Sequence, residues 1–216
     1  NEKYEQAKLV HFDAAQALGK IDVDVHRLWK CDFLTVSSPK IYGPTGAAAL
    51  YVKNPRNLKW PKHQATPNWL SIAGFGRACE LIPFLLEDQK RLKNLKWKMI
   101  DFFEKEIPDS ELNSSVPGSV NNTLNIYLPN VEGEGLVMRC SVRGVYFTTG
   151  SACASQSIKP SRTIMYKFNN DAERAHCSIR LSMGLETTEE DIDYALQVIL
   201  EEYNKLKEFS TSNYRR

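Results

Sequence analysis

The chain has 216 residues, with 28 Lys and Arg against 26 Asp and Glu and a net charge of +2. Basic and acidic residues are interspersed, which argues against a nucleic-acid-binding protein. Hydrophobic residues make up 42% and charged residues 25% of the chain, as in a soluble globular protein of one or two domains. No apolar run approaches the length of a membrane span, and the first five residues do not resemble a signal peptide.

The cysteines are odd in number and form no C-x-x-C pair: Cys31, Cys79, Cys140, Cys153 and Cys177. Neither a disulfide framework nor a zinc site is therefore indicated. This pattern predicts a protein of a reducing compartment, the cytoplasm or the mitochondrial matrix, that is not secreted.

The first part of the chain alternates short apolar runs with turn and helix signals. Predicted strands cover residues 9–12, 31–37 and 47–52. After the first strand, residues 14–17 favour a helix that Gly19 would end. This alternation predicts an α/β sheet, in which ligands collect at strand ends. Asp13 and Lys40 both follow a predicted strand, so we expect a ligand there.

A long helical pattern runs from residue 74 to 107, with Pro83 as a kink or a restart. Its apolar residues recur at spacings of three, four and seven, which predicts one buried face. They are Leu85, Leu92, Leu95, Met99, Phe102 and Phe103. A domain boundary is predicted near Pro83, so that residues 1–84 form one domain and residues 85–216 a second.

The second domain is predicted to be a smaller α+β unit. Its predicted strands cover residues 123–128, 145–148 and 177–182, and its predicted helices residues 134–141 and 161–168. A last helix is predicted to start at Thr187, whose hydroxyl would form a capping box with Glu190. That helix carries an apolar stripe: Ile192, Ala195, Leu196, Ile199, Tyr203 and Leu206.

Lys40 lies between two apolar runs, residues 33–36 and 47–52, and precedes a Gly-Pro-x-Gly turn at residues 43–46. At the mouth of a sheet, apolar atoms and cationic neighbours lower the pKa of an ammonium group and make it a Schiff-base nucleophile. The alternative is a solvated loop lysine, because lysines are rarely buried.

Three segments resemble, in family order, motifs of the cysteine desulfurases, within the class V aminotransferase group of enzymes that use pyridoxal 5'-phosphate (PLP). Residues 13–20 resemble the cofactor-holding turn, residues 40–44 the Schiff-base lysine segment, and residues 150–153 the nucleophile loop. The resemblance covers nearly the whole chain but only about the C-terminal half of a family member. It implies a fold type I α/β architecture. Part of a PLP-binding large domain, with a mainly parallel sheet and helices, precedes a small α+β C-terminal domain that carries the cysteine loop.

The resemblance assigns cofactor-binding roles to four polar residues besides Lys40. Asp13 would keep the proton on the pyridine nitrogen, although Asp is also a preferred helix N-cap. Gln16 would donate to the phenolic oxygen of the ring. Ser37 would bind the phosphate, and its alternative is a turn-forming serine. Thr66 matches a threonine that reaches the phosphate of the neighbouring subunit, which implies a homodimer; the alternative is a threonine that starts a helix.

The catalytic residues implied are Lys40, which would hold PLP and then move the Cα proton of the substrate, and Cys153. A Cys153 thiolate in its polar, glycine-led loop would take the sulfur atom as a persulfide; the alternative is a small buried hydrophobe. Arg180 matches the arginine that clamps the substrate carboxylate. The other four cysteines lie in apolar periodic contexts and are expected to be structural.

The resemblance implies removal of sulfur from L-cysteine, giving L-alanine and a persulfide for a sulfur acceptor or an iron–sulfur scaffold protein. The alternatives are a selenocysteine lyase and a non-catalytic homologue that acts as a binding partner. PLP is the one cofactor expected, with no metal, nucleic acid or membrane partner. The chain also departs from the family pattern: Ser38 and Pro39 replace a Gly-His pair, the segment before Thr66 is shortened, and the family's first half, with its ring-stacking histidine, is not matched.

Overall fold

The computed structural model describes residues 9–27, 30–57, 66–116, 118–150 and 160–213. The chain divides into two compact units, residues 1–89 and 90–216. The assignment of residues 1–84 to a cofactor-binding domain and of residues 85–216 to a small domain stays a prediction.

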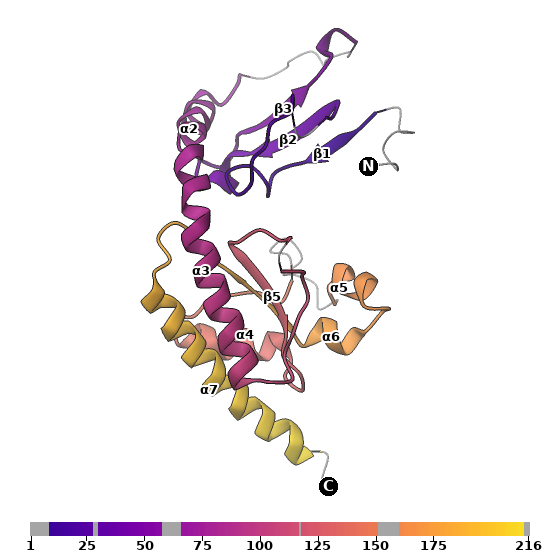
Figure 1. Cartoon of the computed structure of the whole chain (residues 1–216), viewed down its shortest axis with the longest axis vertical. Coiled ribbons are helices and arrows are strands. Elements are labelled where there is room, and N and C mark those ends of the chain that lie inside the picture. Colours follow the sequence, from indigo (N-terminus) through magenta and orange to yellow (C-terminus); the bar gives the residue numbers. More distant parts are fainter. Residues whose placement is uncertain (1–8, 28–29, 58–65, 117, 151–159, 214–216) are drawn as a thin grey trace. The chain divides into compact units, whose positions relative to one another are not determined.

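The first unit contains a three-stranded sheet with the order β1-β2-β3 (Figure 1). Its strands are β1 (His11–Asp13), β2 (Phe33–Ser37) and β3 (Ala48–Val52). β1 runs parallel to β2, and β3 runs antiparallel to β2. The three predicted strands are confirmed, with ends that shift by one or two residues.

The two faces of this sheet differ because successive side chains along a strand point to opposite sides. One face packs into a small apolar core: Phe12, Ala14, Cys31, Leu34 and Val36. The other face carries His11, Asp13, Thr35 and Ser37, of which His11 and Asp13 are exposed. The polar side chains of β1 and β2 therefore share one face of the sheet.

The segment after β1 forms consecutive turns, so the helix predicted at residues 14–17 is wrong. Leu18 N donates to Ala14 O at 3.1 Å, but the hydrogen bonding does not continue into a helix. Gly19 has φ +74°, the left-handed conformation expected of a stop. A Cβ at Gly19 would lie 2.9 Å from Leu85 Cδ1, so both conformation and packing favour glycine.

The 3-10 helix η1 (Ser38–Ile41) follows β2 directly, and Tyr42 closes it in a left-handed conformation with φ 66°. Gly43 comes next, where a Cβ would lie 2.2 Å from Ser38 Oγ. The turn around Lys40 is therefore tight, and it requires glycine at position 43 for reasons of space.

Helix α2 (Trp69–Glu80) packs against the loop that leaves this turn. Ser71 Oγ donates to Thr45 O at 2.9 Å. A Cβ on Gly74 would lie 2.7 Å from Pro44 Cγ, so the helix approaches the loop closely. These contacts connect α2 to the loop that follows the lysine turn.

The break predicted at Pro83 is confirmed, because α2 ends at Glu80 and α3 (Ile82–Glu106) begins after one residue. Pro83 is the second residue of α3, where a missing backbone N–H costs no helical hydrogen bond. The predicted start at residue 74 is wrong, since α2 begins at Trp69.

The second unit is built on an antiparallel sheet with the order β4-β5-β6. Its strands are β4 (Glu111–Leu112), β5 (Thr123–Tyr127) and β6 (Ser178–Ser182), and its helices after α3 are α4 (Gly133–Val142), α5 (Arg162–Lys167), α6 (Ala172–His176) and α7 (Glu189–Asn213). The apolar stripes of α3 and α7 meet the inward residues of β5 and β6 in one core: Leu92, Leu95, Met99, Phe103, Leu124, Ile126, Ile179, Leu181, Ile192, Leu196, Ile199 and Tyr203. The predicted buried faces of both helices are thus confirmed, except that Leu85 packs in the first unit.

Two local predictions in the second unit are wrong. Residues 145–148 form no strand, and only Thr148 makes a bridge, to Arg180. The capping box lies one residue later than predicted, because Thr188 Oγ1 accepts from Asp191 N at 3.1 Å and Asp191 Oδ2 accepts from Thr188 N at 2.9 Å. Thr187 Oγ1 instead accepts from Gly184 N at 2.9 Å.

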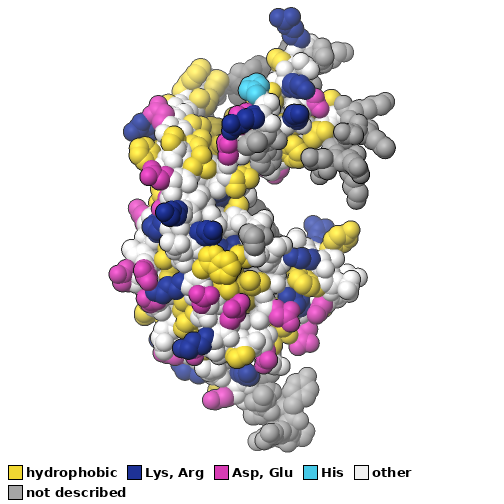
Figure 2. Space-filling model, in the orientation of Figure 1, with side chains coloured by type: hydrophobic (Ala, Val, Ile, Leu, Met, Phe, Trp, Pro, Cys, Tyr) yellow, Lys and Arg dark blue, Asp and Glu magenta, His cyan; other side chains and the backbone are white. Residues whose placement is uncertain are grey.

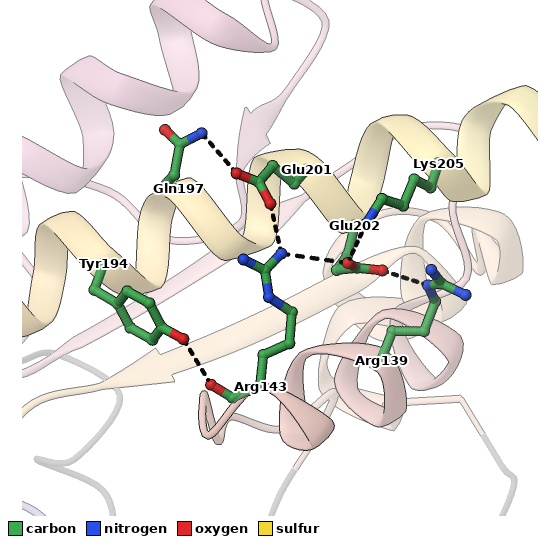
Figure 3. A network of polar contacts seen from close by, with 7 residues as sticks. All are labelled: Arg139, Arg143, Tyr194, Gln197, Glu201, Glu202 and Lys205. Atoms are coloured by element: carbon green, nitrogen blue, oxygen red, sulfur yellow. Dashed lines mark hydrogen bonds and ion pairs between the residues drawn. The ribbon is translucent and has the colours of Figure 1, made fainter.

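A buried carboxylate joins α4 to α7 (Figure 3). Glu202 on α7 is 3% exposed, and it pairs with Arg139 Nε at 2.5 Å and Lys205 Nζ at 2.7 Å. Arg143, at the C-terminal end of α4, lies 2.6 Å from Glu201 and 3.4 Å from Glu202. Both arginines therefore fix the C-terminal end of α4 on α7.

No described helix is by itself long and apolar enough to span a membrane, although α2 and α3 reach that composition when taken together as a bent pair. Within the described ranges, no group of three or more His, Cys, Asp and Glu side chains could hold a metal ion.

Candidate functional site

The polar face of the first unit's sheet carries a compact row of three side chains. Asp13 lies beside Thr35 in the parallel pairing of β1 and β2, and Ser37 is two residues further along β2. Neighbouring strands lie about 4.8 Å apart, and alternate residues of one strand about 6.6 Å apart. Asp13 and Ser37 therefore lie near each other where both strands end, the edge at which α/β sheets bind ligands.

Only one of the two carboxylate oxygens of Asp13 makes a hydrogen bond within the described residues. Its Oδ1 accepts a hydrogen bond from Ala15 N at 3.0 Å, which closes a local turn; because no helix follows, the helix N-cap alternative is not met. Its Oδ2 makes no hydrogen bond within the described part of the chain, and the side chain is exposed. One carboxylate oxygen thus remains for a ligand.

Lys40 projects from η1, immediately after β2, and is exposed. The backbone on both sides of it is fixed, because Ser38 N donates to Ala47 O at 3.1 Å and Gly43 N donates to Ser38 O at 3.0 Å. Pro39 stands at the start of η1, where its fixed φ and missing N–H are compatible with helical structure. This position gives a local reason for proline where the family pattern has histidine.

Gln16 is held by Lys20, a residue for which the sequence predicts no role of its own. Lys20 Nζ donates to Gln16 Oε1 at 2.6 Å. Burial, and secondarily the Lys40 ammonium, lowers the pKa of Lys20. Lys20 therefore lies within electrostatic reach of Lys40 as well as in contact with Gln16. The spacing of four residues between Gln16 and Lys20 is the sequence feature that could have predicted this contact, because residues at that spacing become neighbours in a helical turn.

Ser37 adjoins the lysine turn directly, whereas Thr66 lies further along the chain, just before α2. Ser37 is the N-cap residue of η1, but its side chain makes no capping hydrogen bond, so the hydroxyl is available to a ligand. Thr66 is exposed. The cap of α2 is Asn68, whose Oδ1 accepts from Ser71 N at 3.1 Å, so Thr66 does not start the helix. Its contact with a neighbouring subunit stays a prediction.

In the second unit, Arg180 lies on the polar face of the sheet, opposite Asn125. Arg180 N donates to Thr148 O at 2.6 Å, which ties the strand to the segment leading into the cysteine loop. Its Nε is buried and has no hydrogen-bond partner among the residues that are described. Because an unpaired buried donor is costly, Arg180 is well suited to bind a carboxylate.

Cys153 lies outside the described residues, and Gly150 is the last described residue before it. The other four cysteines are free thiols, and three of them are buried: Cys31, Cys140 and Cys177. Burial, with smaller contributions from nearby carboxylates, raises the pKa of Cys140 and of Cys177 to about 11. Burial also raises the pKa of Cys31 and Cys79. These four thiols are poor nucleophiles at neutral pH.

The donor set of the first unit fits a phosphorylated pyridine aldehyde. A carboxylate oxygen at Asp13 can pair with a protonated ring nitrogen, and the amide of Gln16 can donate to a ring oxygen. The hydroxyl of Ser37 can donate to a phosphate, and the amine of Lys40 can react with an aldehyde. The structure groups these four residues at one end of β1 and β2, whereas Arg180 belongs to the second unit.

The sequence profile of the family described as aminotransferase class-V matches residues 3–65 and 56–195. The chain belongs to the class-V aminotransferase family. Together the two matched segments cover nearly the whole chain, and they include Asp13, Gln16, Ser37, Lys40 and Arg180.

Class-V aminotransferase relatives include cysteine desulfurases of bacteria and plants. The chain is 38% identical over 212 residues to the cysteine desulfurase IscS of Clostridium botulinum, covering 93% of this chain and 53% of that protein. It is 36% identical over 212 residues to a mitochondrial cysteine desulfurase of Arabidopsis thaliana, covering 93% and 46%. The chain thus spans about half the length of the curated relatives it matches.

The fold is shared with solved structures of the same kind. A NifS-like protein from Rickettsia africae superposes with a TM-score of 0.80 at 25% identity, over 94% of this chain and 55% of that one. The expected architecture, part of a fold type I domain with mixed helices and sheets, is therefore confirmed.

Proposed function

We propose that this chain supplies the lysine turn and the cysteine loop of a PLP-dependent cysteine desulfurase, which removes sulfur from L-cysteine to give L-alanine. The observation that carries the proposal is the grouping of Asp13, Gln16, Ser37 and Lys40 at the ends of β1 and β2. The desulfurases among the relatives support the choice of reaction within the family.

PLP, when bound, supplies an electron sink for a carbanion at the reacting carbon. Asp13 would keep the ring nitrogen protonated through its free carboxylate oxygen. Gln16 would donate to the ring oxygen, and Ser37 would donate to the phosphate. Lys40 would provide the amine that holds the aldehyde, and its Nζ, once free, would take the Cα proton of the substrate.

The sulfur-transfer residues belong to the second unit. Arg180 binds the substrate carboxylate, which would satisfy its buried Nε. The Cys153 thiolate attacks the sulfur atom of the substrate; an S–S bond forms, the Cβ–S bond breaks, and the carbon product takes up protons to leave as alanine. The persulfide on Cys153 passes to a sulfur acceptor or an iron–sulfur scaffold protein.

By the family resemblance the protein is a homodimer with a shared active site, in which Thr66, exposed in this chain, reaches the phosphate of the second subunit. The proposed compartment is the cytoplasm or the mitochondrial matrix, which agrees with unpaired cysteines.

Borohydride reduction after addition of PLP, followed by peptide mapping, tests the proposal. The pyridoxyl group is expected on Lys40, and the Lys40→Ala variant should lose the label. Lys20 is the informative control, because it is the neighbouring amine with a lowered pKa. Labelling of Lys20, or of many surface lysines alike, would contradict the assignment of Lys40.

A further inference from the structure

The contact with Lys20 fixes the orientation of the Gln16 side-chain amide. An ammonium group has three donors and no acceptor. The amide atom 2.6 Å from Lys20 Nζ is therefore the oxygen, Oε1, and the Nε2 hydrogens lie at the other end. Gln16 Nε2 makes no hydrogen bond within the described ranges of the chain, so these hydrogens remain free to donate.

The backbone that carries Lys20 is held in position. Lys20 N donates to Ala17 O at 3.0 Å, and the preceding Gly19 has φ +74° and packs against Leu85. The Lys20 side chain is partly buried. Gln16 is exposed, and its one hydrogen bond within the described residues is the one from Lys20 Nζ, so Lys20 is the group that sets the orientation of the amide.

We propose that Lys20 is a positioning residue, which holds Gln16 with its Nε2 hydrogens available to an anionic oxygen on the ring of PLP. This inference rests on the proposed function. Without Lys20, the amide can turn over about its last bond and present Oε1, a second acceptor, to that oxygen. Lys20 thus determines that the Nε2 donor of Gln16, and not its Oε1 acceptor, faces the ring oxygen.

The test uses equilibrium titration of this protein with PLP and two readouts, the dissociation constant and the pH midpoint of the bound cofactor's absorbance change. Lys20→Met is expected to weaken PLP binding about 3- to 10-fold, the usual worth of one hydrogen bond. It should also move the pH midpoint upward, because an oxygen that loses a donor binds a proton more readily. Lys20→Arg, which keeps a cationic donor, should restore both values.

A double-mutant cycle separates positioning from general stabilisation of the fold. If Lys20 acts through Gln16, then Lys20→Met should add little to the effect of Gln16→Leu. Lys53→Met, at an exposed lysine of the same unit, is the matched control and should change neither readout.

The outcomes separate this inference from the proposed function. If the wild-type protein binds PLP through Lys40 but Lys20→Met equals wild type, the positioning role is wrong and the proposed function stands. An equal, additive loss in the Gln16→Leu background also overturns the positioning role. If the wild-type protein takes no PLP at Lys40, the proposed function fails and this inference fails with it.

Discussion

The four cysteine thiols that the structure describes have low reactivity at neutral pH, and this affects which cysteine can carry the sulfur. Cys140 is fully buried, and its pKa of about 11 reflects burial first and the Glu202 carboxylate second. Cys177 is buried beside Glu173, and its pKa is also about 11. A thiol with such a pKa is almost entirely protonated at neutral pH, and only the thiolate is a good nucleophile. Sulfur transfer is therefore expected to use a cysteine outside these sites.

We predict that Cys153 is the first thiol to react when the folded protein meets limiting iodoacetamide at pH 7.5. The reason is the raised pKa of the competing thiols, together with the polar, glycine-led sequence around Cys153. Peptide mapping of the alkylated protein is the measurement. In guanidinium chloride all five cysteines should react at similar rates, which controls for sequence effects. Earlier alkylation of Cys140 or Cys177 in the folded protein would contradict the prediction.

At the scale of single residues, the sequence pointed to much of the candidate site but not to its supporting contacts. Asp13 and Lys40 could be found because each follows an apolar run, and strand ends collect ligands. Lys20 was missed because a lysine four residues from a glutamine is common on helices, and only the fold shows that it is partly buried. The unpaired Nε of Arg180 depends on packing between segments distant in sequence, so no local pattern could reveal it.

Among the elements, α4 and α7 are joined by the charge cluster around Glu202 (Figure 3). The pKa of Glu202 is lowered from 4.5 to about 2, chiefly by its hydrogen bond from Lys205 and further by Arg139, although burial opposes this shift. A carboxylate with a depressed pKa in the folded state stabilises that state above its unfolded pKa. The stabilisation is lost as the pH falls from about 4.5 towards 2.

We predict that Glu202→Gln destabilises the protein at pH 7 by on the order of 2–3 kcal/mol, because it removes the charged partner of Arg139 and leaves Arg143 with Glu201 alone. The difference from wild type should shrink as the pH falls below about 4.5, since Glu202 then becomes protonated in the unfolded state. Urea denaturation at a series of pH values measures both effects.

Glu201→Gln is the matched control, because Glu201 also pairs with Arg143 but has a side chain 40% exposed. Its denaturation midpoint should stay close to that of wild type, since exposed ion pairs contribute little. Equal destabilisation by the two variants would show that burial of Glu202 is not the source of the effect.

The lysine turn offers a second prediction at this scale. Gly43→Ala would place a Cβ 2.2 Å from Ser38 Oγ and 3.0 Å from Ala78 Cβ. Overpacking of this kind costs about 1–3 kcal/mol, and it should displace η1 and weaken the reaction of Lys40 with PLP. Thermal melting and borohydride labelling are the measurements.

Two controls make the Gly43 result specific. Adding Ser38→Ala removes the closest atom and should recover part of the lost stability. Gly76→Ala, in the same helix that packs on the turn, meets no atom within 4 Å and should be neutral or stabilising. Failure of Ser38→Ala to recover any stability would place the strain elsewhere.

Element positions followed from apolar periodicity wherever one face of an element is buried, as in α7 and β5. The sequence prediction failed where a contact between segments decides the structure. Residues 145–148 are apolar enough for a strand, but only Thr148 has a neighbouring strand to bridge. Thr187 and Thr188 are equally good caps by composition, and the turn at Gly184 uses Thr187.

At the scale of the whole molecule, the first unit carries several large apolar side chains that are exposed. Figure 2 shows hydrophobic side chains gathered over α2. The exposed apolar side chains of the first unit include Leu9, Tyr42, Leu50, Trp69, Leu70 and Phe84, with 48–88% of their surface exposed. Three consecutive residues of β3, from Ala48 to Leu50, are exposed, although a strand of an α/β sheet is normally covered on both faces. Such surface is typical of an interface.

The last prediction is that the 216-residue chain by itself turns over cysteine near background and associates through this surface. Cofactor chemistry requires the reacting bond to be held in alignment, and misplacement by about 1 Å can cost ~100-fold in rate. Because the chain spans about half of its relatives' length, contacts from the remaining part are expected to cover the exposed strands and to fix the ring.

Co-expression with the N-terminal half of the Clostridium botulinum relative should reduce binding of an apolar dye and raise alanine release. In the same pairing, Lys40→Ala should reduce dye binding equally but leave alanine release at background, which separates covering the surface from catalysis. A chain that stays monomeric, binds no dye and releases alanine rapidly without a partner would show that its own residues already hold the cofactor in place.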